Sequence, residues 1–347
     1  MNLKSTPRAS GPETLAPIAL PGIFADPAID CPHAQAGRLP APRPRVISAS
    51  KRTDIPAFYL PWFLQRCAAG WVDVPNPRFR HAADPLKRLS HVSLQPEHVL
   101  ALVWWSKNYR IYERFAEKFA PYPVQFFHFT INPRRADLAW VEPDVPPLEE
   151  ALRQMRFLAT LPGGPDVVAW RYDPLLFWAE DGDEKSTWDP SFFEHMCREL
   201  SQIGIRRCIT SLADPYRKFQ QRLKRLYPEK QLREASTDEV AEITRSMAEI
   251  GQIYRIRIEA CSEARLAARP GVERARCIDG ACLSPQASRA AATDTKMPGR
   301  EECGCTLHTD VGDYEEHECG YACIYCYANP NHERFGITRS SRRSRQE

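Results

Sequence analysis

Short apolar segments alternate with longer segments of helical period between residues 45 and 260. The strand candidates are rich in β-branched and aromatic residues, and they span 46–50, 71–74, 102–106, 124–131, 167–172, 207–211 and 254–260. The helix candidates carry apolar residues three and four positions apart, and they span 57–69, 109–119, 148–161, 191–203 and 238–250. This alternation predicts an α/β fold in which a parallel sheet forms a complete or partial (β/α) barrel of the TIM type.

The two ends of the chain depart from this alternation. Residues 1–44 are dense in proline, which removes backbone donors and restricts its predecessors, so we predict a mostly disordered arm. Residues 333–347 carry a basic, serine-containing sequence that is typical of a solvated tail. We therefore divide the chain into this arm, a barrel over 45–260, a cysteine-rich iron–sulfur segment over 261–332 that packs on the barrel mouth, and the tail.

Polar residues gather where the predicted strands end, and the carboxyl ends of barrel strands are where active sites form. Arg52, Lys107 and Arg171 follow or close three of these strands. Such cations can hold a carboxylate or phosphate through charge-assisted hydrogen bonds. The alternative is an internal ion pair, for which Arg171 and Asp173 have suitable i, i+2 spacing on a strand. Asp54 precedes an Ile-Pro sequence, so we predict that it caps the following helix.

Charge and hydropathy exclude few classes of partner. The net charge of +3 on 347 residues is too small to indicate nucleic acid binding from electrostatics alone. No apolar run approaches the roughly 18 residues that span a bilayer, so we expect no membrane partner. The residues after Met1 do not form a signal-peptide apolar region, so we expect a cytoplasmic, reducing location. In that compartment cysteines serve as metal ligands or as buried small residues.

Near the end of the chain three thiols stand at C-x3-C-x2-C spacing: Cys319, Cys323 and Cys326. An aromatic residue, Tyr325, directly precedes the last of them. Three thiolates on one short loop can bind three irons of a [4Fe–4S] cluster and leave the fourth iron open to another ligand. The alternative is a closed structural zinc site that adds one histidine, His317 or His332.

A second set of four cysteines precedes this loop: Cys261, Cys277, Cys303 and Cys305. Ligation by four cysteines suits a second [4Fe–4S] cluster without an open iron, or a structural zinc ion. Cys282 could replace one member of the set. Free thiols are expected at the other cysteines, which stand in the arm or inside apolar patterns. They are Cys31, Cys67, Cys197 and Cys208.

The three-cysteine loop, including Tyr325, resembles the cluster loop of the radical S-adenosylmethionine (radical-SAM) superfamily, whose open iron chelates S-adenosylmethionine. Longer blocks resemble one uncharacterised prokaryotic family, domain-of-unknown-function family 1848, over about residues 46 to 330. These blocks are 47–59, 105–108, 277–279, 300–305, 310–314 and 323–329. The C-terminal cysteines of this family are noted as similar to the radical-SAM cluster. The resemblance therefore implies that Cys319, Cys323 and Cys326 are cluster ligands, but it implies no established reaction.

The position of the loop differs from that in the wider radical-SAM superfamily, where it normally follows the first barrel strand. Here it comes last, so we expect a permuted barrel in which the terminal loop folds back over the mouth. The resemblance of the loop to the radical-SAM superfamily implies reductive cleavage of S-adenosylmethionine, with an electron donor such as a ferredoxin or flavodoxin. The cations at the predicted barrel mouth, Arg52, Lys107 and Arg171, are our candidates to hold that cofactor.

The sequence does not identify the substrate. One interpretation is nucleic acid repair, because spore photoproduct lyase has a similar three-cysteine loop. The alternative function is a non-enzymatic zinc or iron–sulfur protein that serves in binding or electron transfer.

Overall fold

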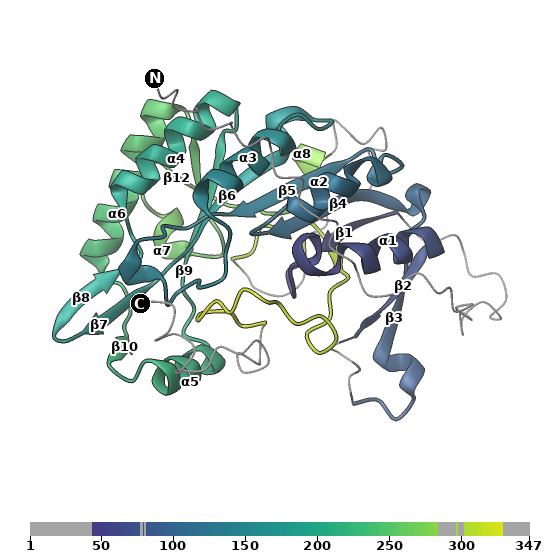
Figure 1. Ribbon diagram of the computed structural model, residues 1–347, viewed down its shortest axis with the longest axis horizontal. Coiled ribbons are helices and arrows are strands. Elements are labelled where there is room, and N and C mark those ends of the chain that lie inside the picture. Colours follow the sequence, from purple (N-terminus) through teal and green to yellow (C-terminus); the bar gives the residue numbers. More distant parts are fainter. Residues whose placement is uncertain (1–43, 77–78, 80, 284–295, 298–301, 329–347) are drawn as a thin grey trace, which may run out of the picture. The chain divides into compact units, whose positions relative to one another are not determined.

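The computed structural model describes residues 44–76, 79, 81–283, 296–297 and 302–328 (Figure 1). The predicted N-terminal arm lies outside these residues except for Pro44, and the predicted basic tail lies wholly outside them. The disordered arm and the solvated tail therefore stay predictions.

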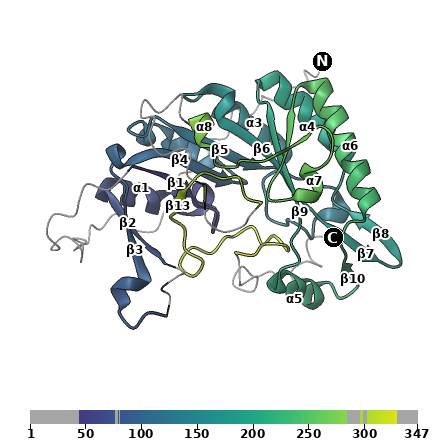
Figure 2. The same cartoon turned by 180° about the vertical axis from the view of Figure 1, so that it is seen from behind.

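The described residues form one central sheet of eight strands, and every neighbouring pair in it is parallel. From one edge to the other the strands are β13 (His308–Asp310), β1 (Arg45–Ala49), β4 (Val99–Ser106), β5 (Gln125–Thr130), β6 (Val168–Leu175), β9 (Arg207–Leu212), β11 (Arg257–Ala260) and β12 (Val272–Arg274). Except for β13, their order in space is their order in the chain. Figure 2 shows the last strand, β13, beside the first. All eight strands therefore end at the same edge of the sheet.

The sheet curves around a polar interior. His128 Nε2 on β5 lies 2.7 Å from the carbonyl oxygen of Cys277, which follows β12, although three strands separate β5 from β12 in the sheet. Among the described residues, however, no hydrogen bonds join the edge strands β12 and β13. The prediction of an α/β fold with a large parallel sheet is therefore confirmed, whereas a closed barrel is not shown.

Helices follow most of the strands, and most of the longer ones lie along one side of the sheet in Figure 1. They are α1 (Leu60–Ala69), α2 (Arg110–Phe115), α3 (Leu148–Leu158), α4 (Pro190–Ile203), α5 (Arg217–Leu226), α6 (Thr237–Tyr254), α7 (Ala264–Ala267) and α8 (Gly280–Leu283). The five predicted helices are confirmed in position, although η1 (Ile55–Tyr59) is a π-helical turn and η5 (Ala116–Phe119) is a 3-10 turn. No helix in this part of the chain is long and apolar enough to cross a membrane.

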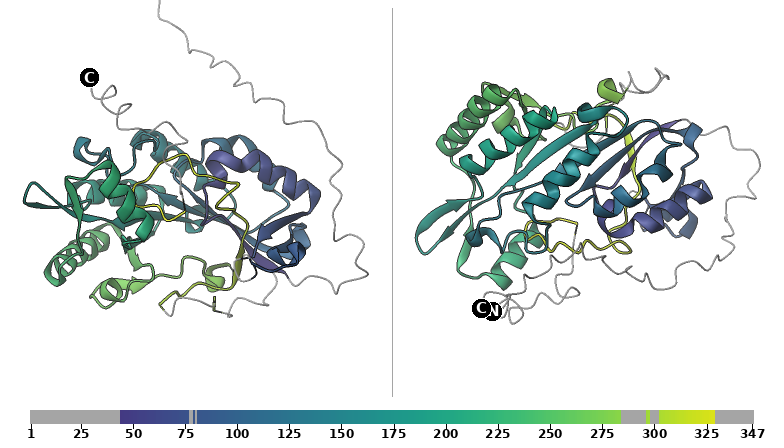
Figure 3. Two further views of the ribbon diagram at one scale, coloured as in Figure 1. Left: turned by 90° about the horizontal axis from the view of Figure 1, so that it is seen from below. Right: turned by 45° about the horizontal axis from the view of Figure 1, so that its top comes forward.

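Capping residues set the ends of the longer helices. Asp189 accepts a hydrogen bond from Phe192 N at the start of α4, and Gly204 ends that helix with a φ of 96°. Ser236 and Glu239 form a reciprocal capping box at the start of α6. With these ends fixed, α4 and α6 pack against each other on the sheet (Figure 3).

Two small antiparallel sheets branch from the central one. In the first, β2 (Trp71–Pro75) pairs with β3 (Leu89–Ser93). In the second, β7 (Phe177–Glu180) lies between β8 (Asp183–Ser186) and β10 (Lys230–Leu232). The strand predicted over 71–74 thus exists, but its predicted place in the parallel sheet was wrong. The predicted start of a strand at Tyr254 was also wrong, because α6 continues through that residue.

Adjacent residues of β4 show how the two faces of the sheet differ. Trp104 points to the helices, where its ring lies 5.5 Å from that of Phe63 and 4.9 Å from that of Phe119. Trp105 points to the opposite face, because side chains alternate along a strand, and it stacks on His128 with 3.9 Å between ring centroids. The helix-covered face is therefore an aromatic core, and the concave face carries polar side chains.

Candidate functional site

The cysteine loop, residues 319–326, lies at the carboxyl edge of the sheet. Three hydrogen bonds with separations of 2.6 to 3.0 Å anchor it, from Tyr59 Oη to Glu318 O, from Tyr327 Oη to Lys51 O and from Ile324 N to Val141 O. A fourth runs from Arg222 Nη2 to Cys326 O. Lys51 and Tyr59 follow β1 closely, so the loop at the end of the chain lies beside the end of its first central strand.

The three thiols of this loop lie close together. Cys323 is buried in a small apolar cluster, and Cys319 and Cys326 pack against it. Burial raises the pKa of Cys319 well above its ordinary value, and Asp54 and the two neighbouring thiols raise it further. Burial also raises the pKa of Cys323, while Lys107 opposes that shift. Within the described ranges, no three His, Cys, Asp or Glu side chains form a ready-made metal site.

A buried carboxylate, Glu142, connects the loop to the strand ends. Its Oε1 accepts hydrogen bonds from Lys107 Nζ at 2.8 Å and Asn132 Nδ2 at 2.7 Å, and from Tyr325 Oη. Burial disfavours the ammonium of Lys107, but Glu142 and Cys323 together raise its pKa above the ordinary value. Lys107 therefore carries a positive charge beside the cysteine loop.

Asp54 joins β1 to β4 beneath the same loop. One of its oxygens accepts from Ala57 N at 3.0 Å, which confirms the predicted helix cap. The carboxyl also accepts from Ser106 Oγ at 2.7 Å and from Lys107 N at 2.9 Å. Burial raises the pKa of Asp54 to about 7, although these hydrogen bonds lower it. This carboxyl therefore fixes the end of β4 relative to the end of β1.

The other two predicted cofactor-binding cations have different surroundings. Arg52 Nη1 donates to Gly312 O at 3.1 Å, in the segment that leads from β13 to the cysteine loop. Arg171 makes the internal ion pair that the sequence left open, with 2.8 Å between its Nη2 and Asp173 Oδ2. Its Nη1 also donates to Cys277 Sγ at 3.3 Å. Lys107 thus lies near the cysteine loop and Arg52 lies on the segment that leads to it, whereas Arg171 faces the second cysteine set.

The structure brings the four thiols of the second set into one chain of contacts. Cys261 Sγ and Cys277 Sγ are 3.2 Å apart, and the Cys305 thiol contacts those of both Cys277 and Cys303. Cys277 and Cys305 are almost completely buried, with 3% and 2% of their surface exposed. The carboxyl ends of β11 and β12 and the approach to β13 thus meet at four sulfur atoms.

A family model matches residues 46–328, which is most of the chain. The chain belongs to DUF1848, a family described as a domain of unknown function. This membership confirms the predicted family. No curated protein matches the chain.

Three residues around the candidate site of this DUF1848 protein were missed by the sequence analysis: Glu142, Arg222 and Asp310. Asp310 accepts from Ser48 Oγ at 2.8 Å, from Ser50 Oγ at 2.6 Å and from Lys51 N at 2.6 Å. It stands in a block that carried the family resemblance, so a signal existed. Glu142 and Arg222 follow no predicted strand, and no local pattern marks them.

The proposed histidine partner of the three-cysteine loop is placed elsewhere. The ring of His317 packs against Trp62 and Tyr59 with centroid distances of 4.2 and 4.7 Å, and its Nδ1 accepts from Asp313 N at 3.3 Å. His332 lies outside the described residues. Cys282 is exposed, and its thiol lies 3.5 Å from Asp279 Oδ2. The geometry therefore adds neither His317 to the three-cysteine loop nor Cys282 to the second set.

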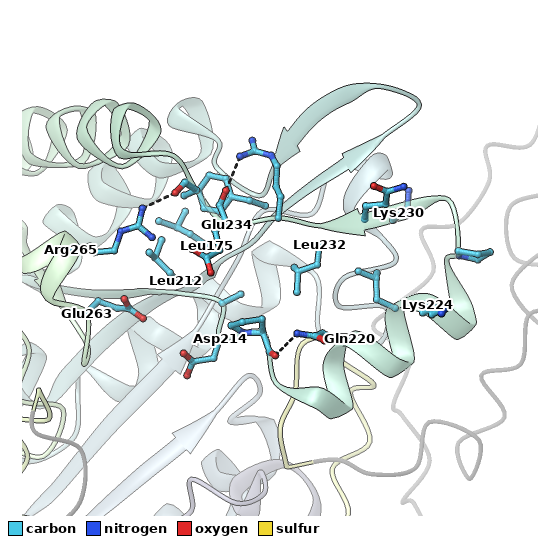
Figure 4. Close-up of a pocket in the computed structure, with 18 residues that line it drawn as sticks. Leu175, Leu212, Asp214, Gln220, Lys224, Lys230, Leu232, Glu234, Glu263 and Arg265 are labelled. Atoms are coloured by element: carbon cyan, nitrogen blue, oxygen red, sulfur yellow. Dashed lines mark hydrogen bonds between the residues drawn. The ribbon is translucent and has the colours of Figure 1, made fainter.

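A pocket of about 720 Å³ opens at the ends of β6 and β9. Leu175 and Leu212 line it from the strand ends, Lys224 from α5 and Arg265 from α7 (Figure 4). Its lining combines apolar, cationic and acidic side chains. Because α5 also carries Arg222, one helix forms a wall of this pocket and holds the cysteine loop.

Proposed function

We propose that this DUF1848 protein is a radical-SAM-like iron–sulfur enzyme in which Cys319, Cys323 and Cys326 bind a [4Fe–4S] cluster. The observation that carries the proposal is the position of the loop. Although it is last in the chain, it lies at the carboxyl edge of a parallel sheet, where α/β enzymes place their catalytic groups. A closed structural module would need no such position.

The order of the strands supports a barrel-like frame for this site. Successive strands pair in chain order, and β13 returns to β1 as the eighth strand of a TIM-type barrel does. We therefore propose an open barrel whose seam lies between β12 and β13. In this frame the chain is permuted, since the loop that normally follows the first strand follows the last.

The donor set of the loop fits a cluster with one open iron, because it offers three thiols, while His317, the nearest histidine in sequence among the described residues, is held by Asp313, Tyr59 and Trp62. Held by these three thiolates, such a cluster would supply the electron for reductive cleavage of S-adenosylmethionine, the chemistry by which radical-SAM enzymes remove hydrogen from a substrate. The Lys107 ammonium offsets thiolate charge next to Cys323. Arg222 holds the loop through the Cys326 carbonyl.

Arg52 and the pocket have separate proposed roles, the first in binding the cofactor and the second in binding the substrate. We propose Arg52 for the carboxylate of S-adenosylmethionine, because its guanidinium lies on the segment that leads to the loop, where it contacts Gly312 O and pairs with Asp310 at 3.9 Å. We propose that the substrate enters the pocket lined by α5, α7 and the ends of β6 and β9. The mixed charge of this lining favours a small polar molecule over a nucleic acid backbone. A ferredoxin or flavodoxin would supply the electron.

The test is anaerobic purification of the wild type and Cys323→Ala, with iron, sulfide and zinc analysis and an assay for 5′-deoxyadenosine after reduction with S-adenosylmethionine. The wild type should contain about four irons in this loop, and its reduced EPR signal should change when S-adenosylmethionine is added. Cys323→Ala should lose this iron and the cleavage activity. Cys197→Ala removes a buried thiol from α4 and is the matched control, which should keep both.

Two results would contradict the proposal. The first is cleavage of S-adenosylmethionine that persists in Cys323→Ala. The second is zinc in place of iron in this loop, which would favour the alternative of a non-enzymatic metal protein.

A further inference from the structure

Four cysteines from three separate segments meet where the two edge strands of the sheet, β12 and β13, face each other. Cys261 follows β11, Cys277 follows β12, and Cys303 and Cys305 precede β13. A backbone hydrogen bond of 2.8 Å from Cys261 N to Thr210 O fixes the first segment to β9. Two more of the same length join the three segments, from Ala275 N to Ala260 O and from Thr306 N to Ile278 O. The convergence of the thiols therefore follows from the backbone, and it does not depend on side-chain rotamers alone.

Cationic side chains and a backbone N–H group surround the four thiols. Arg171 donates to Cys277 Sγ at 3.3 Å, and the amide of Cys305 donates to the sulfur of Cys303. A second cation, Lys51, acts electrostatically on both Cys303 and Cys305. Arg171 and Lys51 both lie over the ring of Trp105, at 5.2 and 5.1 Å from its centroid. Two cations and an N–H···S bond are what a site with excess thiolate charge requires.

We propose that Cys261, Cys277, Cys303 and Cys305 bind a single zinc ion that joins the two edges of the sheet. The position gives the ion a structural role, because its ligands come from both sides of the β12–β13 seam, where the described strands share no hydrogen bonds. The proposal does not depend on the function of the three-cysteine loop.

The sulfur separation favours one ion over a second iron–sulfur cluster. Tetrahedral zinc with Zn–S bonds of about 2.3 Å places its sulfurs about 3.8 Å apart. In a [4Fe–4S] cluster each thiolate binds a different iron, so the four sulfurs stand farther apart than around one ion. Cys261 Sγ and Cys277 Sγ are 3.2 Å apart. A small outward movement of the thiols would admit zinc, whereas a cluster would require the backbone segments to separate.

The experiment compares metal content per chain in anaerobically purified wild type and variants. The wild type should carry about one zinc, which Cys261→Ala and Cys305→Ala should lose while keeping their iron. Cys323→Ala should keep the zinc and lose iron. Cys208→Ala removes a buried thiol from β9 outside both sets and should change neither metal. Loss of iron without loss of zinc in Cys323→Ala would thus support the proposed enzyme. Loss of zinc without loss of iron in Cys261→Ala and Cys305→Ala would support the zinc site.

Two further measurements keep the result decisive if the buried variants do not fold. Cys303 is only half-buried, so Cys303→Ala should fold and should still lose the zinc. Cobalt(II) added to the metal-free wild type should give the visible and near-ultraviolet bands of tetrahedral thiolate coordination, and these bands should weaken in Cys303→Ala. Zinc retained in both Cys303→Ala and Cys261→Ala would overturn the proposal, as would about four irons lost from these variants. A metal-free wild type with a Cys261–Cys277 disulfide would overturn it too.

Discussion

Glu142 shows how much one residue contributes to the site. It is 8% exposed and accepts hydrogen bonds from Lys107, Asn132 and the tyrosine of the cysteine loop. Buried charges of this kind are tolerated because each has a partner, and removing one partner leaves the other unpaired in a medium that solvates it poorly. The orientation of Tyr325 therefore depends on a carboxylate that itself depends on Lys107.

Lys107→Met should lower the free energy of unfolding by about 3 kcal/mol, because it leaves Glu142 buried without its cation. Urea unfolding of the metal-free protein at neutral pH measures the change. Arg245→Ala is the control, since the Arg245 side chain is 64% exposed and pairs with Glu249, which is 60% exposed. An exposed pair of this kind contributes less than about 1 kcal/mol. Equal losses in the two variants would show that the Lys107–Glu142 pair is not effectively buried.

At the scale of the element, the cap of α6 is a case in which sequence and structure agree closely. Ser236 Oγ accepts from Glu239 N at 3.1 Å, and the Glu239 carboxylate accepts from Ser236 N at 2.8 Å. Arg233 Nη1 adds a bond of 2.8 Å to that carboxylate. Hydrogen bonding to Arg233, with that to Ser236, lowers the pKa of Glu239 to about 2. The carboxylate form of Glu239 therefore stabilises the folded protein.

Glu239→Gln should lower the free energy of unfolding by about 1 kcal/mol at pH 7, a usual value for a helix cap. The pKa of Glu239 is below its ordinary value of 4.5 in the folded state, so its contribution is complete above that pH and is lost as the pH falls toward 2. The difference between wild type and variant should therefore shrink from pH 5 to pH 3 in urea unfolding. A difference that grows over this interval would contradict the assignment.

Elements with a strong local pattern could be predicted from the sequence, and elements defined by their partners could not. The cap of α6 and the aromatic strand β5 carry their own signals. By contrast, β12 and β13 have three residues each, too few to show a period of two, and they are strands only because a parallel neighbour pairs with them. The β7–β8 hairpin had a usable signal in Asp181-Gly182, whose φ values of 54° and 87° fit a type I′ turn.

In the whole molecule, the candidate site exists because residues 302–328 return to β1, the first strand of the central sheet. Both cysteine sets were recognisable from spacing, but their surroundings were not, since Glu142, Arg222 and Lys51 are distant from the cysteines in sequence. The return itself depends on Asp310, which accepts from Ser48, Ser50 and Lys51. The return also requires glycine at position 312, because the returning backbone there passes close to Ser50 at the end of β1.

Gly312→Ala should loosen the whole returning segment. A Cβ there would lie 2.0 Å from Ser50 Oγ and 2.8 Å from Ser50 Cβ, so residues 310–313 must move away from β1. We expect a loss of about 2 kcal/mol, as for other overpacked sites, and faster amide exchange over residues 305–328. Hydrogen–deuterium exchange measured by mass spectrometry checks both the segment and its extent.

The matched control is Gly182→Ala in the β7–β8 turn, where no atom lies within 4 Å of the added Cβ and φ is +87°. It should cost about 1 kcal/mol through backbone strain alone and leave exchange over 305–328 unchanged. If Gly312→Ala also left that exchange unchanged, the contact between Gly312 and Ser50 would not be what holds the cysteine loop. The loop would then owe its position to its own anchors, the Tyr59, Tyr327 and Arg222 side chains. The site would in that case be assembled locally, by side chains at the carboxyl edge, and the β1–β13 pairing would follow from it.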